Sequence, residues 1–274
     1  MVVDSTYPPA QHMLRDLALS VEHHEDGSSV GRLPVVDAVL DDHGRVRAGV
    51  VATLVDAIGG GLAAYAAAPG WIATADLDLQ LTGTPTDAST IDARGRVLRA
   101  GRSTVVIAVD LRVGSAELGL ATMTFAVLPR RDSNPVMPVD RVRGPQSFLG
   151  GGDGSGFTTG VLDALGIRTV DGACGHVELV PSGYVENSLG AVQGGVVATI
   201  AERAAELALS SAAGVALAPV GLQITYLALA REGPIRASAE VLGVAPEWGS
   251  ARVELFDAGA SRRTTVARVA ATRI

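Results

Sequence analysis

The stretch Asn187–Glu202, NSLGAVQGGVVATIAE, decides how this chain is organised. Polar, turn-forming residues open it, two glycines follow, and an apolar run typical of a buried helix completes it. A loop that enters a helix at Gly194 leaves unpaired backbone N–H groups at the helix start. Together with the helix dipole, these donors suit an oxygen atom that gains negative charge. Glu202 lies seven residues beyond Gly195, two helical turns into the helix.

The same pattern occurs once more, far upstream, in RAGVVATLVD, residues 47–56. The tetrapeptide Val-Val-Ala-Thr is common to both stretches, Gly49 corresponds to Gly195, and Asp56 corresponds to Glu202. A shared tetrapeptide alone could arise by chance in a chain rich in Ala and Val. Both copies, however, continue into an Ala-rich stretch and then into several strand-like runs, which indicates duplication of one unit.

Each repeat is expected to contain one long helix and a set of antiparallel strands. Residues 76–81 alternate polar and apolar side chains, as in a half-buried strand. The helices are apolar nearly all round, which is typical of a helix wrapped by a sheet. For the first repeat, 28–130, we expect a strand over 30–40, a helix over 50–68 and strands over 76–81, 90–98, 104–113 and 118–128. For the second, 161–274, we expect a short helix over 161–165, a strand over 173–179, a helix over 196–213 and strands over 222–226, 235–244, 250–256 and 264–274.

Two segments lie outside the repeats. Residues 1–27 are expected to form a lead-in with a short amphipathic helix over 10–21. His23 and His24 stand beside two acidic residues, which resembles a metal-ligand cluster, but we expect a solvated turn there and no metal site. Residues 131–160 are rich in Pro and Gly and are expected to be a linker without a core element.

Composition excludes several classes of function. The net charge is −7 and aromatic residues make up 4%, so the basic stripe with interleaved aromatics that nucleic-acid binding needs is missing. Cys174 is the single cysteine, which rules out an intramolecular disulfide, and we expect a small buried hydrophobe there. Residues 57–75 are uncharged but dominated by Ala and Gly and broken by Pro69, so we expect no membrane span.

Location and assembly are expectations from the same composition. Residues 1–15 lack the basic start and apolar core of a signal peptide, which favours a cytoplasmic protein. Charged residues make up only 19%, so part of the surface is expected to be covered by another subunit in a homodimer.

An Asn, then a Gly, then Gln-Gly-Gly leading into a helix with an acid seven residues later resembles the hotdog thioesterase superfamily, and most closely its PaaI-like acyl-CoA thioesterases. The resemblance covers roughly residues 28–128 and 175–274. It implies an α+β double hotdog, in which each repeat wraps an antiparallel sheet around a long central helix and the two sheets join into one. It also implies hydrolysis of an acyl-CoA substrate without a further cofactor. Gln193 departs from the His that is commoner at this position.

The resemblance further implies a composite site between the repeats. The second repeat supplies Asn187, Gln193 and the Gly194 N–H, which polarise the carbonyl, and the first supplies the acid Asp56. Thr74, eighteen residues after Asp56, resembles the family's Ser/Thr that positions the attacking water. A buried carboxylate in an apolar helix is costly, which independently favours a functional Asp56.

A second site is possible at Glu202 with the backbone of Ala48 and Gly49, although its loop offers Asp41 and Arg47 in place of amide donors. A structural salt bridge for Glu202 is an equal alternative, because Arg203 and Glu206 are nearby. For substrate binding we expect contributions from the small residues Gly195, Gly59 and Gly60 and from the basic turn residue Arg102. A local kink without a role is an equal alternative for the glycines at 59–61.

Three functions remain open from the sequence. The first is an acyl-CoA thioesterase, the second is a non-catalytic acyl-CoA-binding protein of the same fold, and the third is an acyl-CoA hydratase or dehydratase. The lyase would need a His with an acid, and neither His43 nor His176 stands at a helix entry. Ser155 does not form a nucleophile elbow, because it is not centred between the glycines and no strand precedes it.

Overall fold

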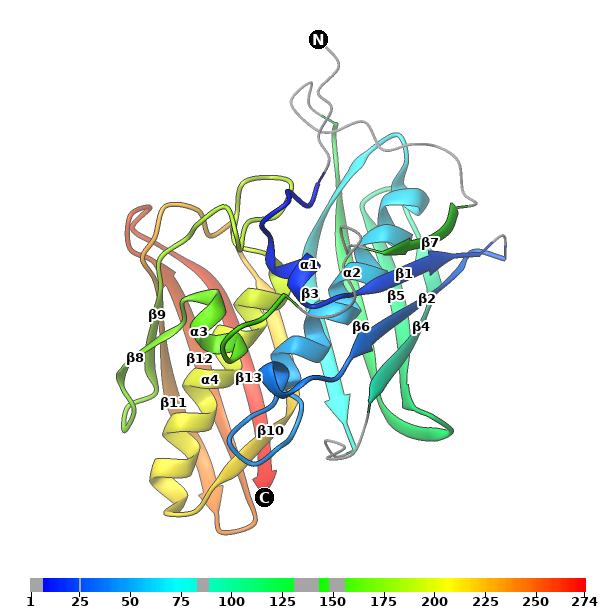
Figure 1. Ribbon diagram of the computed structural model, residues 1–274. Coiled ribbons are helices and arrows are strands. Elements are labelled where there is room, and N and C mark those ends of the chain that lie inside the picture. The colour runs from blue at the N-terminus through cyan, green and yellow to red at the C-terminus, as the bar shows by residue number, and fades with distance from the viewer. Residues whose placement is uncertain (1–6, 25, 83–88, 131–142, 148–155) are drawn as a thin grey trace.

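A computed structural model describes residues 7–24, 26–82, 89–130, 143–147 and 156–274 (Figure 1). Thirteen strands form a single sheet in the order β7-β1-β2-β4-β5-β6-β3-β10-β13-β12-β11-β9-β8. The lead-in contains α1 (Met13–Asp16) and β1 (Ser20–His23), and the segment between the repeats contains β7 (Arg143–Ser147). The first repeat has β2 (Ser28–Pro34), η1 (Asp37–Val39), α2 (Ala48–Ala67), β3 (Trp71–Leu81), β4 (Thr90–Ala100), β5 (Thr104–Val113) and β6 (Ala116–Leu128). The second has α3 (Val161–Leu165), β8 (Arg168–Asp171), β9 (His176–Leu179), α4 (Gly194–Ala213), β10 (Leu217–Tyr226), β11 (Ile235–Ala245), β12 (Trp248–Asp257) and β13 (Arg262–Arg273).

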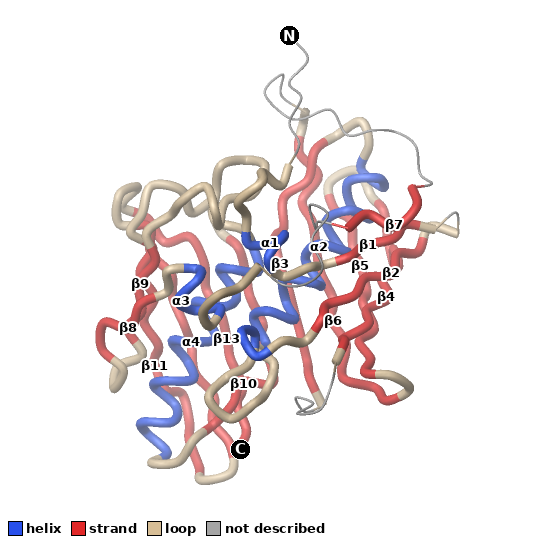
Figure 2. The backbone as a smooth tube through the Cα atoms, viewed as in Figure 1, coloured by secondary structure: helices blue, strands red, loops and turns tan. Residues whose placement is uncertain are grey.

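The two long helices lie on one side of this curved sheet, each in front of the strands of its own repeat (Figure 2). Both helices begin directly after a glycine-containing loop and present buried aliphatic side chains to the sheet, including Leu54, Ile58 and Ile200. The expected α+β double hotdog with one continuous sheet is therefore confirmed.

Strands β3 and β10 join the two halves of the sheet by antiparallel pairing. Asp78 lies opposite Gln223, with Leu77 opposite Ile224 and Leu79 opposite Leu222. Residues at equal distances from Asp78 and Gln223 along the two strands are therefore paired with each other. A pseudo-twofold axis through this pair produces such an arrangement.

The helices α2 and α4 cross at their N-terminal ends, and glycine permits the close approach. A Cβ placed on Gly49 would lie 2.4 Å from Thr199 Cα, and one on Gly195 would lie 2.5 Å from Thr53 Cα. The shared tetrapeptide therefore has a structural reason, since each Thr sits against the Gly of the other repeat. This crossing brings the acid of each helix to the start of the other.

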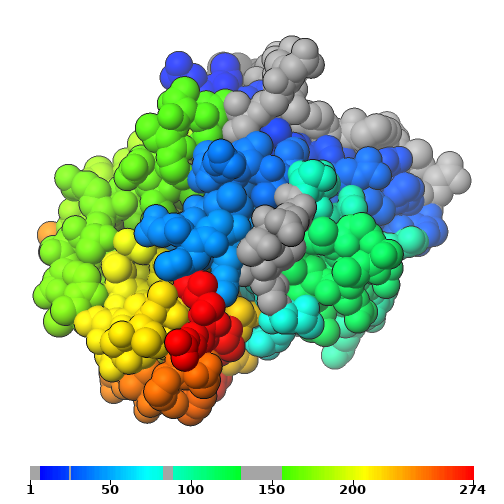
Figure 3. Space-filling view, turned by 60° about the horizontal axis from the view of Figure 1, so that its bottom comes forward, coloured from blue at the N-terminus to red at the C-terminus, as the bar shows by residue number. Residues whose placement is uncertain are grey.

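The segment before α2 also contacts the second repeat. In the space-filling view the blue residues that precede α2 lie against the yellow residues of the second repeat (Figure 3), and Arg47 forms a buried ion pair with Glu206 at 3.0 Å. Of the helices in the described ranges, α2 alone is long and apolar enough to cross a membrane by composition. Its position inside the curved sheet accounts for that apolarity.

Several local expectations were wrong. The strand expected over 30–40 ends at Pro34. The helix expected over 10–21 is limited to α1, because residues 20–23 form the strand β1 instead, which pairs with β2. His23 is consequently buried in the sheet rather than in a solvated turn, with its Nδ1 2.5 Å from Ser29 Oγ. Cys174 is exposed, not buried.

The segment between the repeats also differs from expectation where it can be described. Residues 143–147 form β7, which pairs with β1 at the sheet edge, so this segment adds a strand to the first repeat. Most of the expected linker, residues 131–142 and 148–155 with Ser155, lies outside the described residues.

Candidate active site

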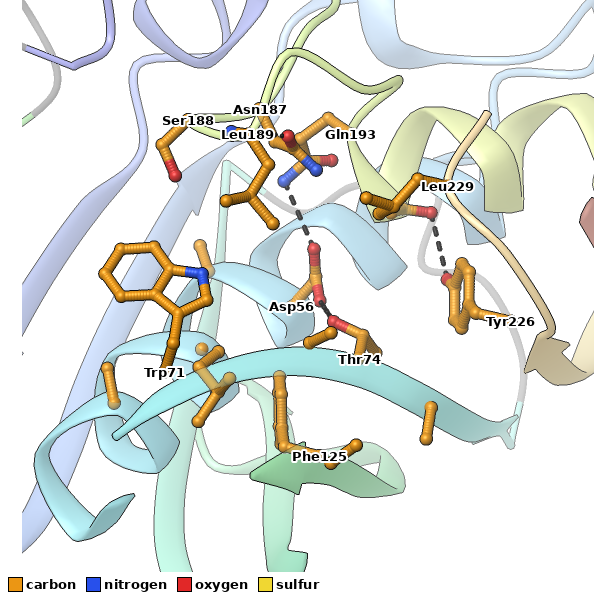
Figure 4. Close-up of a pocket in the computed structure, with 18 of the residues that line it drawn as sticks. Asp56, Trp71, Thr74, Phe125, Asn187, Ser188, Leu189, Gln193, Tyr226 and Leu229 are labelled. Atoms are coloured by element: carbon orange, nitrogen blue, oxygen red, sulfur yellow. Dashed lines mark hydrogen bonds between the residues drawn. The ribbon is translucent and has the colours of Figure 1, made fainter. Parts of the chain in front are cut away.

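A cavity of about 650 Å³ opens between the two repeats and contains the predicted site. Its walls include Asp56 and Thr74 from the first repeat and Asn187, Gln193 and Gly194 from the second (Figure 4). The helix crossing produces this juxtaposition, because it places the middle of α2 beside the start of α4. The five residues predicted as catalytic are thus brought to one place, and their roles remain predictions.

Asp56 is held by one donor from each repeat. Thr74 Oγ1 donates to Asp56 Oδ1 at 3.0 Å, and Gln193 Nε2 donates to Asp56 Oδ2 at 3.3 Å (Figure 4). Burial raises the pKa of Asp56 from 3.8 to about 6, although the Thr74 hydroxyl favours the ionised form. A carboxylate with a pKa near neutrality is suited to accept a proton during a reaction.

The start of α4 offers an unoccupied donor next to this carboxylate. The N–H of Gly194, the first residue of α4, has no acceptor within the described part of the chain. A Cβ on Gly194 would lie 2.8 Å from Asp56 Oδ2, so only glycine lets the helix start approach the acid so closely. The N–H therefore points out of a helix N-terminus at the wall of a cavity, where it can stabilise an oxyanion.

Gln193 and Tyr226 fix the position of this helix start. Gln193 Oε1 accepts from Gly195 N at 2.7 Å and caps α4, which turns its Nε2 toward Asp56. Tyr226 Oη donates to the carbonyl of Gly194 at 3.0 Å. A Gln in place of the commoner His is thus able both to cap the helix and to donate to the acid.

Asn187 shapes the loop ahead of α4. Its Oδ1 accepts from Leu189 N at 2.9 Å and from Ala191 N at 3.2 Å, and Gly190 adopts a φ of +66° in the same turn. Asn187 also lines the cavity. These two hydrogen bonds support the turn, and a direct contact with substrate stays a prediction.

The pseudo-equivalent position is closed by its own acid. Glu202 Oε1 accepts from Ala48 N and Oε2 accepts from Gly49 N, both at 2.9 Å. Glu202 is only 3% exposed. Burial raises its pKa to about 7, against the opposing effects of Arg47 and the two N–H groups. The carboxylate therefore occupies the place that an oxyanion would take, and Glu202 acts as the cap of α2.

The expected substrate-binding residues are only partly at the cavity. Gly60 lines it, with open space where a side chain would be. Gly59 instead packs against Met123 and Phe125, and Gly195 packs against Thr53. Arg102 lies in an exposed turn and is not among the residues that line the cavity. Gly59, Gly195 and Arg102 therefore do not line this cavity, since the sheet and the helix crossing determine where the two glycines face, and a role in substrate binding stays a prediction for all three.

The lead-in supports the Asn187 loop, a contact that the sequence did not predict. His12 Nε2 lies 2.8 Å from the carbonyl of Glu186, and Tyr7 Oη donates to the same carbonyl at 3.2 Å. Tyr184 Oη donates to Asp16 Oδ2 at 2.7 Å. The lead-in thus packs across the repeats onto the loop of the second, and Tyr7 also lines the cavity. Contacts between residues so far apart leave no local signal in a sequence.

Comparisons with known proteins agree with this architecture. Residues 189–262 match the family model of the thioesterase superfamily. No curated protein matches the chain.

Several solved structures are similar over nearly their whole length. An acyl-ACP thioesterase from Bacteroides thetaiotaomicron is 12% identical with a TM-score of 0.61, covering 90% of this chain and 98% of that one. The 12:0-ACP thioesterase from Umbellularia californica is 10% identical with a TM-score of 0.62, and the similarity covers 90% of this chain and 95% of that one. The tesB protein from Mycobacterium avium subsp. paratuberculosis is 12% identical with a TM-score of 0.57, covering 89% and 93%.

Proposed function

We propose that this protein hydrolyses acyl-CoA thioesters at the composite site of Asp56, Thr74, Gln193 and Gly194. Two findings support this: residues 189–262 match the family model of the thioesterase superfamily, and 90% of the chain shares the fold of a solved acyl-ACP thioesterase. The PaaI-like resemblance supports coenzyme A as the carrier. The substrate would lie in the cavity between the repeats with its thioester between Asp56 and the start of α4.

The proposed reaction uses Asp56 as a general base. Thr74 donates to Asp56, which leaves lone pairs of its hydroxyl oxygen to hold a water molecule beside the carboxylate. Asp56 takes a proton from this water while the water oxygen attacks the thioester carbon. The carbonyl oxygen becomes an oxyanion that the Gly194 N–H stabilises. Collapse breaks the C–S bond, and the proton on Asp56 passes to the departing thiolate.

One observation supports this function above the others: the two helix starts are used differently. At α2 both donors, Ala48 N and Gly49 N, are taken by Glu202. At α4 the shorter acid Asp56 leaves the N–H of Gly194 without an acceptor in the described residues, although its carboxylate lies against that glycine. A protein that used both helix starts only for stability would not need this difference.

The test is hydrolysis by the purified protein of acyl-CoA, acyl-pantetheine and acyl carrier protein thioesters with the same acyl chains. Because Cys174 is exposed and would react with thiol reagents, the assay uses a Cys174→Ser background or follows free acid by mass spectrometry. We expect turnover of acyl-CoA that depends on Asp56. Hydrolysis only of the carrier-protein thioesters would reassign the carrier, since two of the similar structures are acyl-ACP thioesterases. Saturable binding of acyl-CoA without turnover would instead identify a non-catalytic binding protein.

A further inference from the structure

The cavity continues past Asp56 toward the C-terminal end of α2. Gly60 and Ala64, one and two helical turns after Asp56, line it. On the opposite side β3 runs back from Thr74 to Trp71, three residues or ~10 Å along the strand. If the proposed function holds and the thioester lies at Asp56, this continuation accommodates the acyl group.

Trp71 places an unpaired polar atom beside this part of the cavity. Its side chain lines the cavity and the residue is only 9% exposed. The indole Nε1 is buried and has no hydrogen-bond partner among the described residues. Figure 4 shows the nitrogen on the ring edge that faces Asp56. Buried Trp N–H groups usually find an acceptor, so an unpaired one at the wall of a cavity, on the ring edge that faces Asp56, points to an acceptor on the ligand.

Two further polar side chains lie at this end of the cavity. His23 and Tyr65 line the cavity and meet edge to face with ring centroids 5.1 Å apart. Gly61 is what lets His23 reach the cavity, because a Cβ there would lie 2.7 Å from His23 Cε1. A cavity made only for a saturated hydrocarbon chain would not place three polar side chains at this end.

We propose, resting on the proposed function, that the acyl group of the substrate carries an oxygen atom away from the thioester, as a hydroxyl, oxo or carboxylate group, and that the Trp71 N–H recognises it. The oxygen would take the hydrogen bond that Trp71 lacks. An acyl group without that oxygen would leave the donor buried and unpaired, which disfavours it about tenfold to hundredfold.

The experiment compares pairs of acyl-CoA substrates of equal length, one unsubstituted and one bearing a hydroxyl, oxo or carboxylate group at successive carbons. For the wild-type protein we expect at least one oxygenated member to be preferred by about tenfold or more in kcat/KM. Trp71→Phe, which keeps an aromatic ring but lacks the N–H, should abolish that preference. The control Leu229→Met alters an apolar residue of the same cavity and should change both members of each pair alike.

A second measurement needs neither turnover nor the Trp71→Phe variant. The chain has two tryptophans, and Trp248 is 51% exposed, so a Trp248→Phe protein gives one indole N–H signal in a ¹⁵N spectrum, that of Trp71. Binding of at least one oxygenated acyl-CoA of the panel to an Asp56→Asn version should shift this signal downfield, and binding of its unsubstituted partner should not. The proposal is overturned if no oxygenated substrate is preferred, or if Trp71→Phe lowers both members of each pair equally, as a contact with the shared coenzyme would. Absence of turnover for every thioester contradicts the proposed function instead, and the NMR result then decides the binding preference alone.

Discussion

Replacing Asp56 and Glu202 separately by their amides should give opposite results, because the two acids occupy corresponding positions but make different contacts. Asp56→Asn removes the group that accepts the proton of the attacking water. Loss of a general base lowers the rate by about 10²- to 10⁴-fold. Glu202→Gln alters the cap of α2, where both backbone donors are already occupied, and should leave kcat/KM within about threefold of the wild-type value.

The stability of Asp56→Asn should move in the other direction from its activity. The folded-state pKa of about 6 lies above the ordinary 3.8, so the folded state binds the proton more tightly than the unfolded state does. The cost of burying the ionised carboxylate is absent below about pH 4, grows as the pH rises to about 6, and is constant above. The difference between these two pKa values corresponds to a destabilisation of the folded state of at most ~3 kcal/mol at pH 8, which the neutral amide avoids. Asp56→Asn should therefore melt at the same temperature or higher than wild type at pH 8.

The assay measures release of free acid from a panel of acyl-CoA substrates, with thermal melts at pH 4.5 and pH 8 for each protein. Rates are normalised to the folded fraction, so that a destabilised Glu202→Gln is not mistaken for an inactive one. If Glu202→Gln is the inactive variant and Asp56→Asn is active, the site has been assigned to the wrong acid. If neither substitution changes the rate, hydrolysis does not proceed through either helix start.

Three further outcomes are expected. Because Asp56 must be ionised to act as a base, kcat/KM should be level above about pH 6 and fall roughly tenfold per pH unit below it; a rate that is independent of pH down to pH 4 would exclude Asp56 as the base. Asp56→Glu should lower the rate by about 10² or more although the carboxylate is kept, because the longer side chain can reach the Gly194 N–H as Glu202 reaches Ala48; wild-type rates in this variant would show that Gly194 is not the oxyanion donor. Finally, we propose a homodimer, since the outer face of the sheet exposes Leu120, Trp248 and Phe256; light scattering that gives one chain's mass at micromolar concentration would contradict it.

The repeat is the part of this protein that the sequence determined most fully. The Gly-x-x-x-Thr spacing at 49–53 and 195–199 is local, and it encodes both the helix starts and the contact between them. Most strands of the sheet could be predicted for the same reason, since alternation and turn residues act over a few neighbouring positions. The pairing of Asp56 with Gln193 could be inferred only through the resemblance, because nothing local connects residues 137 positions apart.

The tertiary structure decided which acid faces an open donor and which polar groups the cavity presents. Asp56 and Glu202 differ by one methylene in the sequence, and only their placement against the helix starts shows that one carboxylate fills the anion position and the other does not. Trp71 fell between the expected helix and the expected strand, and His23 was expected in a solvated turn, yet both line the cavity, and the small size of Gly61 is what lets His23 lie there. These features depend on the relative positions of several helices and strands at once, and local sequence patterns do not specify those positions.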